Sequence, residues 1–209
     1  MSNSKILVFA GSARAESLNK KLAAAGAAAI RKAGGEATLI DLNDYPAPIY
    51  HGDDEEAHGV PENILALKKL IAEHDGLMIA TPEYNGFVPP LLVNTFSWVS
   101  RPSKNGGPEN VLKSKHVAVM AASPGRLGGV RVVPRLRDCL CELGCVPVEG
   151  FVTVPGAGSA FGEDGNLADG AGQKGLDALA SRLVKATGYI GRASGRGRVE
   201  TSGDAGAVR

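Results

Sequence analysis

The sequence predicts an α/β protein in which a five-stranded parallel sheet is covered by helices on both faces. Short apolar stretches alternate with helical patterns five times along the chain. Three of these stretches, Ile6–Ala10, Leu77–Ala80 and Val117–Ala122, are apolar throughout, which is typical of strands buried on both faces. A polar, glycine-containing loop follows each of the three. In a parallel sheet such loops gather outside the carboxyl ends of the strands, where ligands bind.

Glycine and proline divide the first part of the chain into a strand, a helix and a second strand. The strand Ile6–Ala10 leads to apolar residues at helical spacing over 18–33, and the Gly34–Gly35 pair ends that helix. A second short strand is expected at Ala37–Asp41. Two prolines then keep 43–50 in a stiff, extended loop without regular structure.

The segment that follows this loop is strongly acidic. His51, His58 and the carboxylates of 53–56 are side chains that can bind a metal. Runs of carboxylates usually face water instead. We therefore predict a solvated acidic turn there and no metal site.

The second part of the chain continues the alternation of helix and strand. A helix is expected to start at Pro61 and to present Ile64, Leu67, Ile71 and His74 on one face, and it is followed by a strand at Leu77–Ala80, a helix at Pro90–Trp98 and a strand at Val117–Ala122. The next helix is marked by Val133, Leu136, Leu140 and Leu143 and ends at Gly144, and a strand lies within Val146–Val154. A last helix has Leu176, Leu179, Leu183 and Ile190 on one face. His74 is expected to be a packing or surface residue.

The length and composition fit one globular domain that carries little net charge. The chain has 209 residues, of which 44% are hydrophobic and 22% charged, and its formal net charge is +1. Such a small charge gives no electrostatic argument for binding nucleic acid or an anionic membrane. We expect a domain over 1–190 and a flexible tail rich in Gly, Ser and Arg over 191–209.

Targeting and membrane signals are not recognisable in the sequence. Residues 1–5 lack the charged-then-apolar build of a secretion signal. No apolar run reaches the ~18 residues that a membrane-spanning helix needs. We therefore expect a cytoplasmic protein.

The three cysteines, Cys139, Cys141 and Cys145, fall in one short segment with no histidine nearby in the sequence. A structural zinc site normally has four ligands, so a metal is not expected here. We predict buried free thiols in a helix and the following strand, which fits a reducing cytoplasm.

The loop after the first strand has the donors that a phosphate needs. A strand that turns directly into a helix leaves free backbone N–H groups at the helix N-terminus, where anions bind. Ser12, Ser17 and Asn19 add hydrogen-bond donors, and Arg14 offers a charged planar fork. The loop therefore predicts a phosphate site. An ordinary strand–helix connection capped by Ser17 explains the same residues equally well.

The first loop lacks the patterns of two common nucleotide folds. It contains no Gly-x-x-x-x-Gly-Lys-Ser/Thr and no Gly-x-Gly-x-x-Gly. A flavodoxin-like strand order, 2-1-3-4-5, instead places FMN at the switch point between strands one and three. We expect the single phosphate of FMN at the first loop, and its flat ring beside the loops at 82–86 and 123–125.

Four motifs occur in a fixed order along the chain. They are Gly11-Ser12-x-Arg14-x-x-Ser17-x-Asn19, Thr81-Pro82-Glu83-Tyr84-Asn85, Asn94 to Trp98-x-Ser100-Arg101, and Ser123-Pro124-Gly125 with Gly128-Gly129-x-Arg131. In spacing and order they resemble the NADPH-dependent FMN reductase family, a flavodoxin-like group that includes quinone, chromate and azo-dye reductases. Weaker similarity continues to about Thr187.

The resemblance implies a role for each loop. In the family, the FMN phosphate is bound by the residues that match Ser12, Arg14, Ser17 and Asn19. The residues that match 82–85 lie along the isoalloxazine and ribityl groups. Those that match 123–125 lie at the polar edge of the ring. The predicted cofactor-binding residues are Gly11, Ser12, Arg14, Ser17, Leu18, Asn19, Pro82, Glu83, Tyr84, Asn85, Gly86, Ser123, Pro124 and Gly125.

The resemblance also implies an activity: hydride transfer from NADPH or NADH to FMN, and then electron transfer to a quinone, chromate, azo or similar small acceptor. No side-chain acid or base is needed, so we predict no catalytic residue. A homodimer or homotetramer is implied as well. Here the chain departs from the family, because Val93 and Ser97 replace a Lys and an Asp in a helix that relatives bury between subunits.

Two other classes of protein share parts of this pattern. A non-enzymatic flavodoxin-type electron carrier or flavin-binding module would use the same loops, although flavodoxins tend to be strongly acidic and this chain has a net charge of +1. An α/β domain without flavin would explain the alternation but not the three loops. Direct turnover of NAD(P)H separates the enzyme from the carrier.

Overall fold

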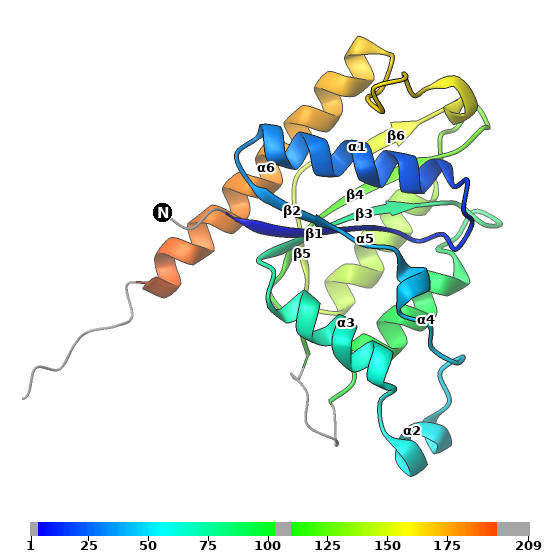
Figure 1. Cartoon of the computed structure of the whole chain (residues 1–209), viewed down its shortest axis with the longest axis vertical. Coiled ribbons are helices and arrows are strands. Elements are labelled where there is room, and N and C mark those ends of the chain that lie inside the picture. The colour runs from blue at the N-terminus through cyan, green and yellow to red at the C-terminus, as the bar shows by residue number, and fades with distance from the viewer. Residues whose placement is uncertain (1–3, 103–109, 196–209) are drawn as a thin grey trace, which may run out of the picture.

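The computed structural model describes residues 4–102 and 110–195 and forms three layers (Figure 1). The central layer is a parallel sheet in the order β2-β1-β3-β4-β5, with β6 also paired to β4. Its strands are β1 (Lys5–Ala10), β2 (Glu36–Leu39), β3 (Gly76–Thr81), β4 (His116–Ala122), β5 (Val146–Pro147) and β6 (Val152–Val154). The flavodoxin-like fold and strand order predicted from the sequence are confirmed.

Helices cover both faces of the sheet, as Figure 1 shows. On one face lie α1 (Leu18–Lys32) and α6 (Gly170–Gly195), and on the other lie α3 (Glu62–Ala72), α4 (Pro90–Val99) and α5 (Val132–Glu142). The side chains of β1 alternate between the two cores: Leu7 and Phe9 pack with α3 to α5, and Ile6, Val8 and Ala10 pack with α1 and α6.

Small residues let α1 lie close to the sheet. The helix is rich in alanine, the strongest helix former, and Ser17 caps its N-terminus. A Cβ added at Gly26 would stand 2.9 Å from side-chain atoms of both Met78 and Met120. The middle of α1 is therefore held tightly against β3 and β4.

The expected fifth strand is divided into two short strands. Both β5 and β6 pair with β4, and the chain between them leaves the sheet at Gly150, whose φ is +82°. The Arg137 guanidinium donates to the carbonyls of Val148 and Gly150 at 2.8 and 3.0 Å. These two carbonyls are thus satisfied outside the sheet ladder, and the range 146–154 in which we expected one strand holds two.

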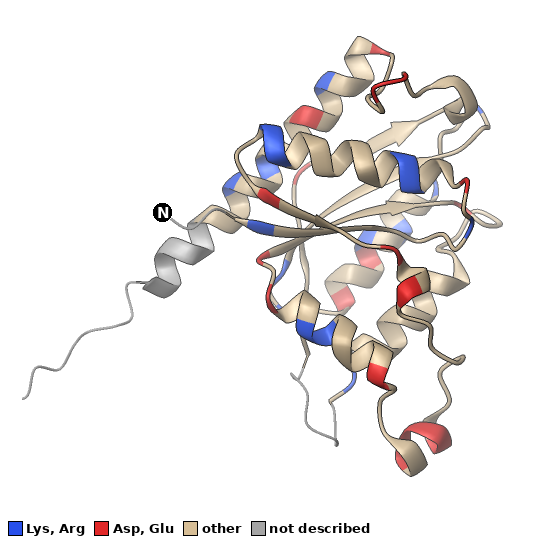
Figure 2. Cartoon of the chain, in the orientation of Figure 1, with Lys and Arg blue, Asp and Glu red and all other residues tan. Residues whose placement is uncertain are grey.

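The acidic segment is a helix and not the turn expected from its charge. α2 (Gly52–His58) has Asp53, Asp54 and Glu55 in its first turn, where the helix dipole favours negative charge. No residue of α2 is buried, and Asp53, Asp54 and Glu56 are exposed, as predicted, whereas Glu55 is half-buried and accepts a hydrogen bond from the Tyr50 hydroxyl at 2.7 Å. Figure 2 shows this acidic helix well separated from the sheet.

Three other boundaries differ from those expected. A 3₁₀ turn, η1 (Leu42–Asp44), occupies the start of the predicted extended loop, and Asp41 caps it. β2 begins at Glu36 and ends at Leu39, before Asp41. α6 extends to Gly195, past the point at 191 where we expected a tail; residues 196–209, and the Asn105–Pro108 loop, lie outside the described residues.

The histidine and cysteine predictions are confirmed in part. His74 is a packing residue: it is buried, and its ring nitrogens contact the Leu70 carbonyl at 2.7 Å and Thr38 Oγ1 at 2.8 Å. All three cysteines are free thiols. Cys145 is buried, which raises its pKa to about 12, whereas Cys139 is half-buried and Cys141 is exposed, contrary to expectation.

Candidate functional site

The three polar loops meet at the carboxyl edge of the sheet. They follow β1, β3 and β4, which are neighbours in the sheet with continuous parallel register, Ala10 opposite Ala80 and Thr81 opposite Ala121. We call them the first loop (11–17), the second loop (82–89) and the third loop (123–131). The structure therefore brings the predicted site residues together on one edge, as expected for a ligand site in such a sheet.

The first loop presents hydroxyl groups whose hydrogens remain available. Ser17 Oγ accepts hydrogen bonds from the backbone N–H groups of Asn19 and Lys20, at 3.2 and 3.4 Å. Ser12 Oγ accepts one from the backbone N–H of Arg14, at 3.4 Å. A hydroxyl that accepts in this way can still donate its own hydrogen. The two serines can therefore donate to an anion held at the start of α1.

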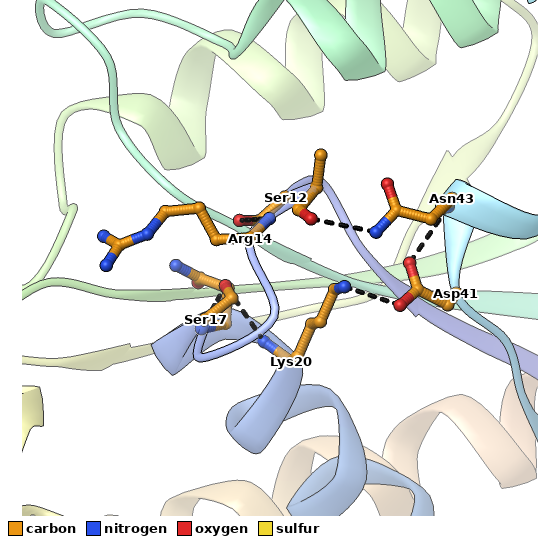
Figure 3. Close-up of polar contacts among 8 residues, drawn as sticks. Ser12, Arg14, Ser17, Lys20, Asp41 and Asn43 are labelled. Carbon is orange, nitrogen blue, oxygen red and sulfur yellow. Dashed lines mark hydrogen bonds and ion pairs between the residues drawn. The ribbon is translucent and has the colours of Figure 1, made fainter. Parts of the chain in front are cut away.

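Arg14 supplies a cation at the same loop. Its side chain is exposed, and among the described residues no carboxylate forms an ion pair with it. Figure 3 shows its guanidinium extending to one side of the first loop, away from Asp41 and Asn43 on the other side. With the serine hydroxyls, it makes a donor set suited to a single phosphate group. On this observation the first loop fits FMN.

Asn19 joins the first loop to the third. Its side-chain amide donates to the carbonyl of Ala122 and accepts from the N–H of the same residue, each at 2.9 Å. Asn19 is buried, and Leu18 beside it is half-buried. Both polar groups of the Asn19 side chain are thus used within the protein. The structure makes Asn19 a positioning residue that fixes the start of α1 against the end of β4.

Gly11 permits a close approach between the first loop and α4. Its backbone N–H donates to the carbonyl of Ala80 at 2.8 Å. A Cβ at this position would stand 2.5 Å from the side chain of Leu92. The absence of a side chain therefore lets α4 lie directly behind the loop.

The second loop is a tight turn with an aromatic rim. Tyr84 and Phe87 exchange backbone hydrogen bonds at 3.1 and 2.9 Å, and Asn85 and Gly86 between them both have positive φ, +53° and +74°. Positive φ at both central residues is the pattern of a type I′ turn. The Tyr84 and Phe87 side chains remain 45% and 55% exposed. The turn thus offers flat apolar surface beside the first loop, as a ring system would need.

Glu83 fixes the second loop to the third. Its carboxylate forms an ion pair with Arg131, whose Nε donates at 2.7 Å, and it also accepts from the backbone N–H groups of Arg131 and Val132 at 3.1 and 3.2 Å. The Glu83 side chain is only 7% exposed. The sequence motifs contain both residues but do not reveal this pairing, which joins positions 48 residues apart.

The third loop is held in place by its own hydrogen bonds at the edge of the site. Ser123 donates its N–H to the carbonyl of Val154 at 3.1 Å, and its Oγ accepts from the N–H of Gly125 at 3.1 Å. Pro124 and Gly125 are exposed. The main chain here is held by β6 and is exposed at the carboxyl edge of the sheet.

A cavity that the sequence did not indicate lies on the other side of the first loop. It has a volume of about 270 Å³, and its lining residues are Ala10, Lys20, Ala23, Leu39, Ile40 and Asp41. Lys20 Nζ lies 2.5 Å from the carboxylate of Asp41 (Figure 3). Burial opposes ionisation of Asp41, but hydrogen bonds from Lys20 and the Asn43 N–H, together with the Lys20 charge, lower its pKa below the usual value.

The described residues offer neither a metal site nor a membrane span. Over 4–102 and 110–195, no three His, Cys, Asp or Glu side chains gather as metal ligands would. Within the same ranges, every helix is too short or too polar to cross a bilayer.

Comparison with known proteins identifies relatives of this chain. The family model described as NADPH-dependent FMN reductase matches residues 4–159. An NAD(P)H-dependent FMN reductase of Pseudomonas aeruginosa is 32% identical over 169 residues, which is 79% of this chain and 85% of that protein. A quinone reductase of Escherichia coli is 35% identical over 108 residues, so the matched part spans 50% of this chain and 55% of that protein.

Solved structures give the same result. The flavoenzyme FerB of Paracoccus denitrificans, an NAD(P)H:(acceptor) oxidoreductase, superposes with a TM-score of 0.74 at 27% identity. The superposition covers 89% of this chain and 98% of FerB. Sequence and three-dimensional likeness therefore agree over the part of the chain that carries the three loops.

Proposed function

The chain belongs to the NADPH-dependent FMN reductase family, and from that premise we propose that it oxidises NAD(P)H through FMN and delivers the electrons to a quinone. It is an oxidoreductase that uses FMN and NAD(P)H. The observation that supports the site is the meeting of a loop with available hydroxyl donors, an aromatic turn and an exposed third loop at one sheet edge.

We propose that the first loop holds the phosphate of FMN. Ser12 and Ser17 donate their hydroxyl hydrogens to the phosphate, and Arg14 neutralises its charge. Asn19 keeps this loop in register with the third loop instead of contacting the ligand through its side chain.

The second and third loops receive the ring. Bound FMN would supply the redox chemistry, which is hydride acceptance from NAD(P)H and onward electron transfer. Pro82, Tyr84 and Asn85 line the ring and exclude water, while the backbone N–H of Arg126, which forms no hydrogen bond among the described residues, donates to its polar edge. Fixed donors of this kind stabilise negative charge in a poorly hydrated site. No side-chain acid or base is needed.

We propose a quinone as the acceptor because relatives are named quinone reductase, and chromate and azo compounds as alternatives to be tested. The exposed Val93 and half-buried Leu91 on α4 favour association with a second copy, as a homodimer or homotetramer. The free thiols at Cys139, Cys141 and Cys145 suit the cytoplasm.

The test starts from the purified protein and its visible spectrum. The protein should take up FMN, and it should then oxidise NADH or NADPH only when flavin and an acceptor (a benzoquinone, chromate or an azo dye) are present. A colourless protein that neither binds FMN nor supports flavin-dependent NAD(P)H oxidation would contradict the proposal. Tight FMN binding without direct NAD(P)H turnover would instead indicate a flavodoxin-type electron carrier.

A further inference from the structure

The cavity beside the first loop is built to hold a small, mostly apolar group with polar edges. Four of its lining residues, Ala10, Ala23, Leu39 and Ile40, are apolar, and Lys20 and Asp41 are the charged pair among them. Its volume, about 270 Å³, is below the ~300–1,000 Å³ of sites that enclose a whole drug-sized ligand. It therefore suits one end of a dinucleotide, such as a nucleoside, and not the whole molecule.

The position of the cavity in the fold is informative. Ala10 ends β1, Leu39 ends β2 and Ala23 comes from α1, so the cavity opens at the same carboxyl edge as the three loops. It lies on the β2 side of β1, whereas the second loop lies on the β3 side. Asn43 donates to the carbonyl of Ala13 at 2.8 Å and thereby joins the wall of the cavity to the first loop (Figure 3).

Asp41 lies just after β2, where an acidic side chain binds ribose in other nucleotide-binding folds. In doubly wound dinucleotide folds, an acidic side chain shortly after the second strand accepts hydrogen bonds from the ribose hydroxyls of the adenosine moiety. A nearby cation at such a site accommodates the 2′-phosphate of NADP instead. In this chain both types of group are present, with Lys20 Nζ 2.5 Å from Asp41.

Resting on the proposed function, we propose that this cavity binds the adenosine end of NAD(P)H and that the Lys20–Asp41 pair sets the preference between NADH and NADPH. Asp41 accepts from the 2′- and 3′-hydroxyls of the ribose and repels a 2′-phosphate. Lys20 attracts that phosphate. Each charge therefore favours a different coenzyme.

The experiment measures binding without hydride transfer. Protein loaded with FMN is titrated by calorimetry with ADP-ribose and with 2′-phospho-ADP-ribose, which carry the adenosine ends of NADH and NADPH but no nicotinamide. Asp41→Asn should shift the affinity ratio about tenfold toward the 2′-phosphate probe, and Lys20→Met should shift it about tenfold the other way. The kcat/KM ratio for NADPH over NADH should move in the same directions.

Matched controls lie next to each residue. Lys21→Met removes a charge from the neighbouring position on α1, where the side chain is exposed, and Asp44→Asn removes one from the exposed end of η1. Because Asp41 caps η1, Asp41→Ser, which keeps a capping oxygen, serves as a second variant. FMN affinity and urea unfolding of every variant report whether the fold is retained.

The outcomes separate this inference from the proposed function. Probe ratios that shift less than twofold in Asp41→Asn, Asp41→Ser and Lys20→Met, or no more than in the controls, would overturn the adenosine subsite even if the enzyme is active. A quinone that binds in the cavity without displacing either probe would overturn it as well. Absence of any NAD(P)H oxidation with normal FMN binding would contradict the proposed function itself.

Discussion

At the scale of single residues, the donors of the first loop divide into those whose hydrogens remain available and those that bond within the protein. Ser12, Ser17 and Arg14 keep hydrogen-bonding capacity that the protein does not use. Asn19 uses one amide N–H and its side-chain oxygen on Ala122. This division leads to two opposite expectations for substitution.

Replacing Arg14 should affect the ligand and not the fold. Arg14→Ala removes one charge-assisted pair with the FMN phosphate, worth about 1.5–3 kcal/mol, so FMN should bind at least tenfold more weakly while urea unfolding of the apoprotein is unchanged. Flavin fluorescence quenching measures the Kd. Lys21→Ala, at an exposed neighbouring position, is the control. Unaltered FMN affinity in Arg14→Ala would mean that the phosphate binds elsewhere.

Replacing Asn19 should affect the fold first. Asn19→Leu leaves the buried N–H and carbonyl of Ala122 without their side-chain partner, which costs about 2–3 kcal/mol of unfolding free energy. The midpoint of urea unfolding should fall accordingly, and FMN binding should weaken because the first loop loses its register. Asn63→Ala, which removes an exposed amide bonded to Pro46, should stay within about 0.5 kcal/mol of the wild type. Equal stability of the two variants would contradict the positioning role.

At the scale of elements, backbone conformation in the third loop sets the start of α5. Gly128 and Gly129 have φ of +59° and +81°, and a Cβ at Gly128 would lie 2.7 Å from the backbone nitrogen of Pro155. Main-chain atoms cannot move aside as a flexible side chain can. The loop therefore depends on glycine here to stay packed on the segment that follows β6.

Gly128→Ala should accordingly destabilise the protein. The left-handed conformation alone costs a non-glycine residue about 1–2 kcal/mol, and the contact with Pro155 adds to this. Thermal unfolding should show a lower Tm. Gly158→Ala is the matched control, because a Cβ there meets nothing within 4 Å and its φ is not positive. A Tm for Gly128→Ala equal to that of the control would contradict the assigned conformation.

The elements show how far sequence patterns reach. Alternating apolar stretches predicted β1, β3 and β4 and the helices between them, because burial on both faces demands continuous apolar sequence. The division of the fifth strand was not predictable from these patterns. It depends on Arg137, which lies on another element and binds the carbonyls that a continuous strand would have paired.

The site shows the same limit. The meeting of the three loops at one edge followed from their place after buried strands, but the partners of Asn19 and Glu83 lie 103 and 48 residues away. Such pairings depend on three-dimensional proximity and leave no local pattern. The cavity at Lys20 and Asp41 was missed for this reason too, since its walls come from three separate elements.

At the scale of the whole molecule, the two edges of the sheet differ in character. The carboxyl edge carries the polar loops, whereas His116 begins β4 at the opposite edge. Its Nδ1 is buried and has no hydrogen-bond partner among the described residues, and burial lowers its pKa below 6.5. The folded protein therefore binds this proton less readily than the unfolded chain.

This difference predicts a loss of stability in mild acid. As the pH falls below about 6.5, the unfolded chain takes up the proton first, so the unfolding free energy decreases with decreasing pH. His116→Val should lose less stability than the wild type between pH 7 and pH 5, as measured by urea unfolding at each pH. His58→Gln, on the exposed α2, is the control. An identical pH dependence in His116→Val and wild type would contradict the prediction.

The bond between Asn19 and Ala122 also bears on how the protein is made. A ribosome releases the chain from its N-terminus, so residues 11–19 emerge long before their anchor at the end of β4. The nascent chain cannot complete its first loop until Ala122 has emerged and β4 has paired with β3. Assembly of this loop must therefore wait until more than half of the polypeptide has been synthesised.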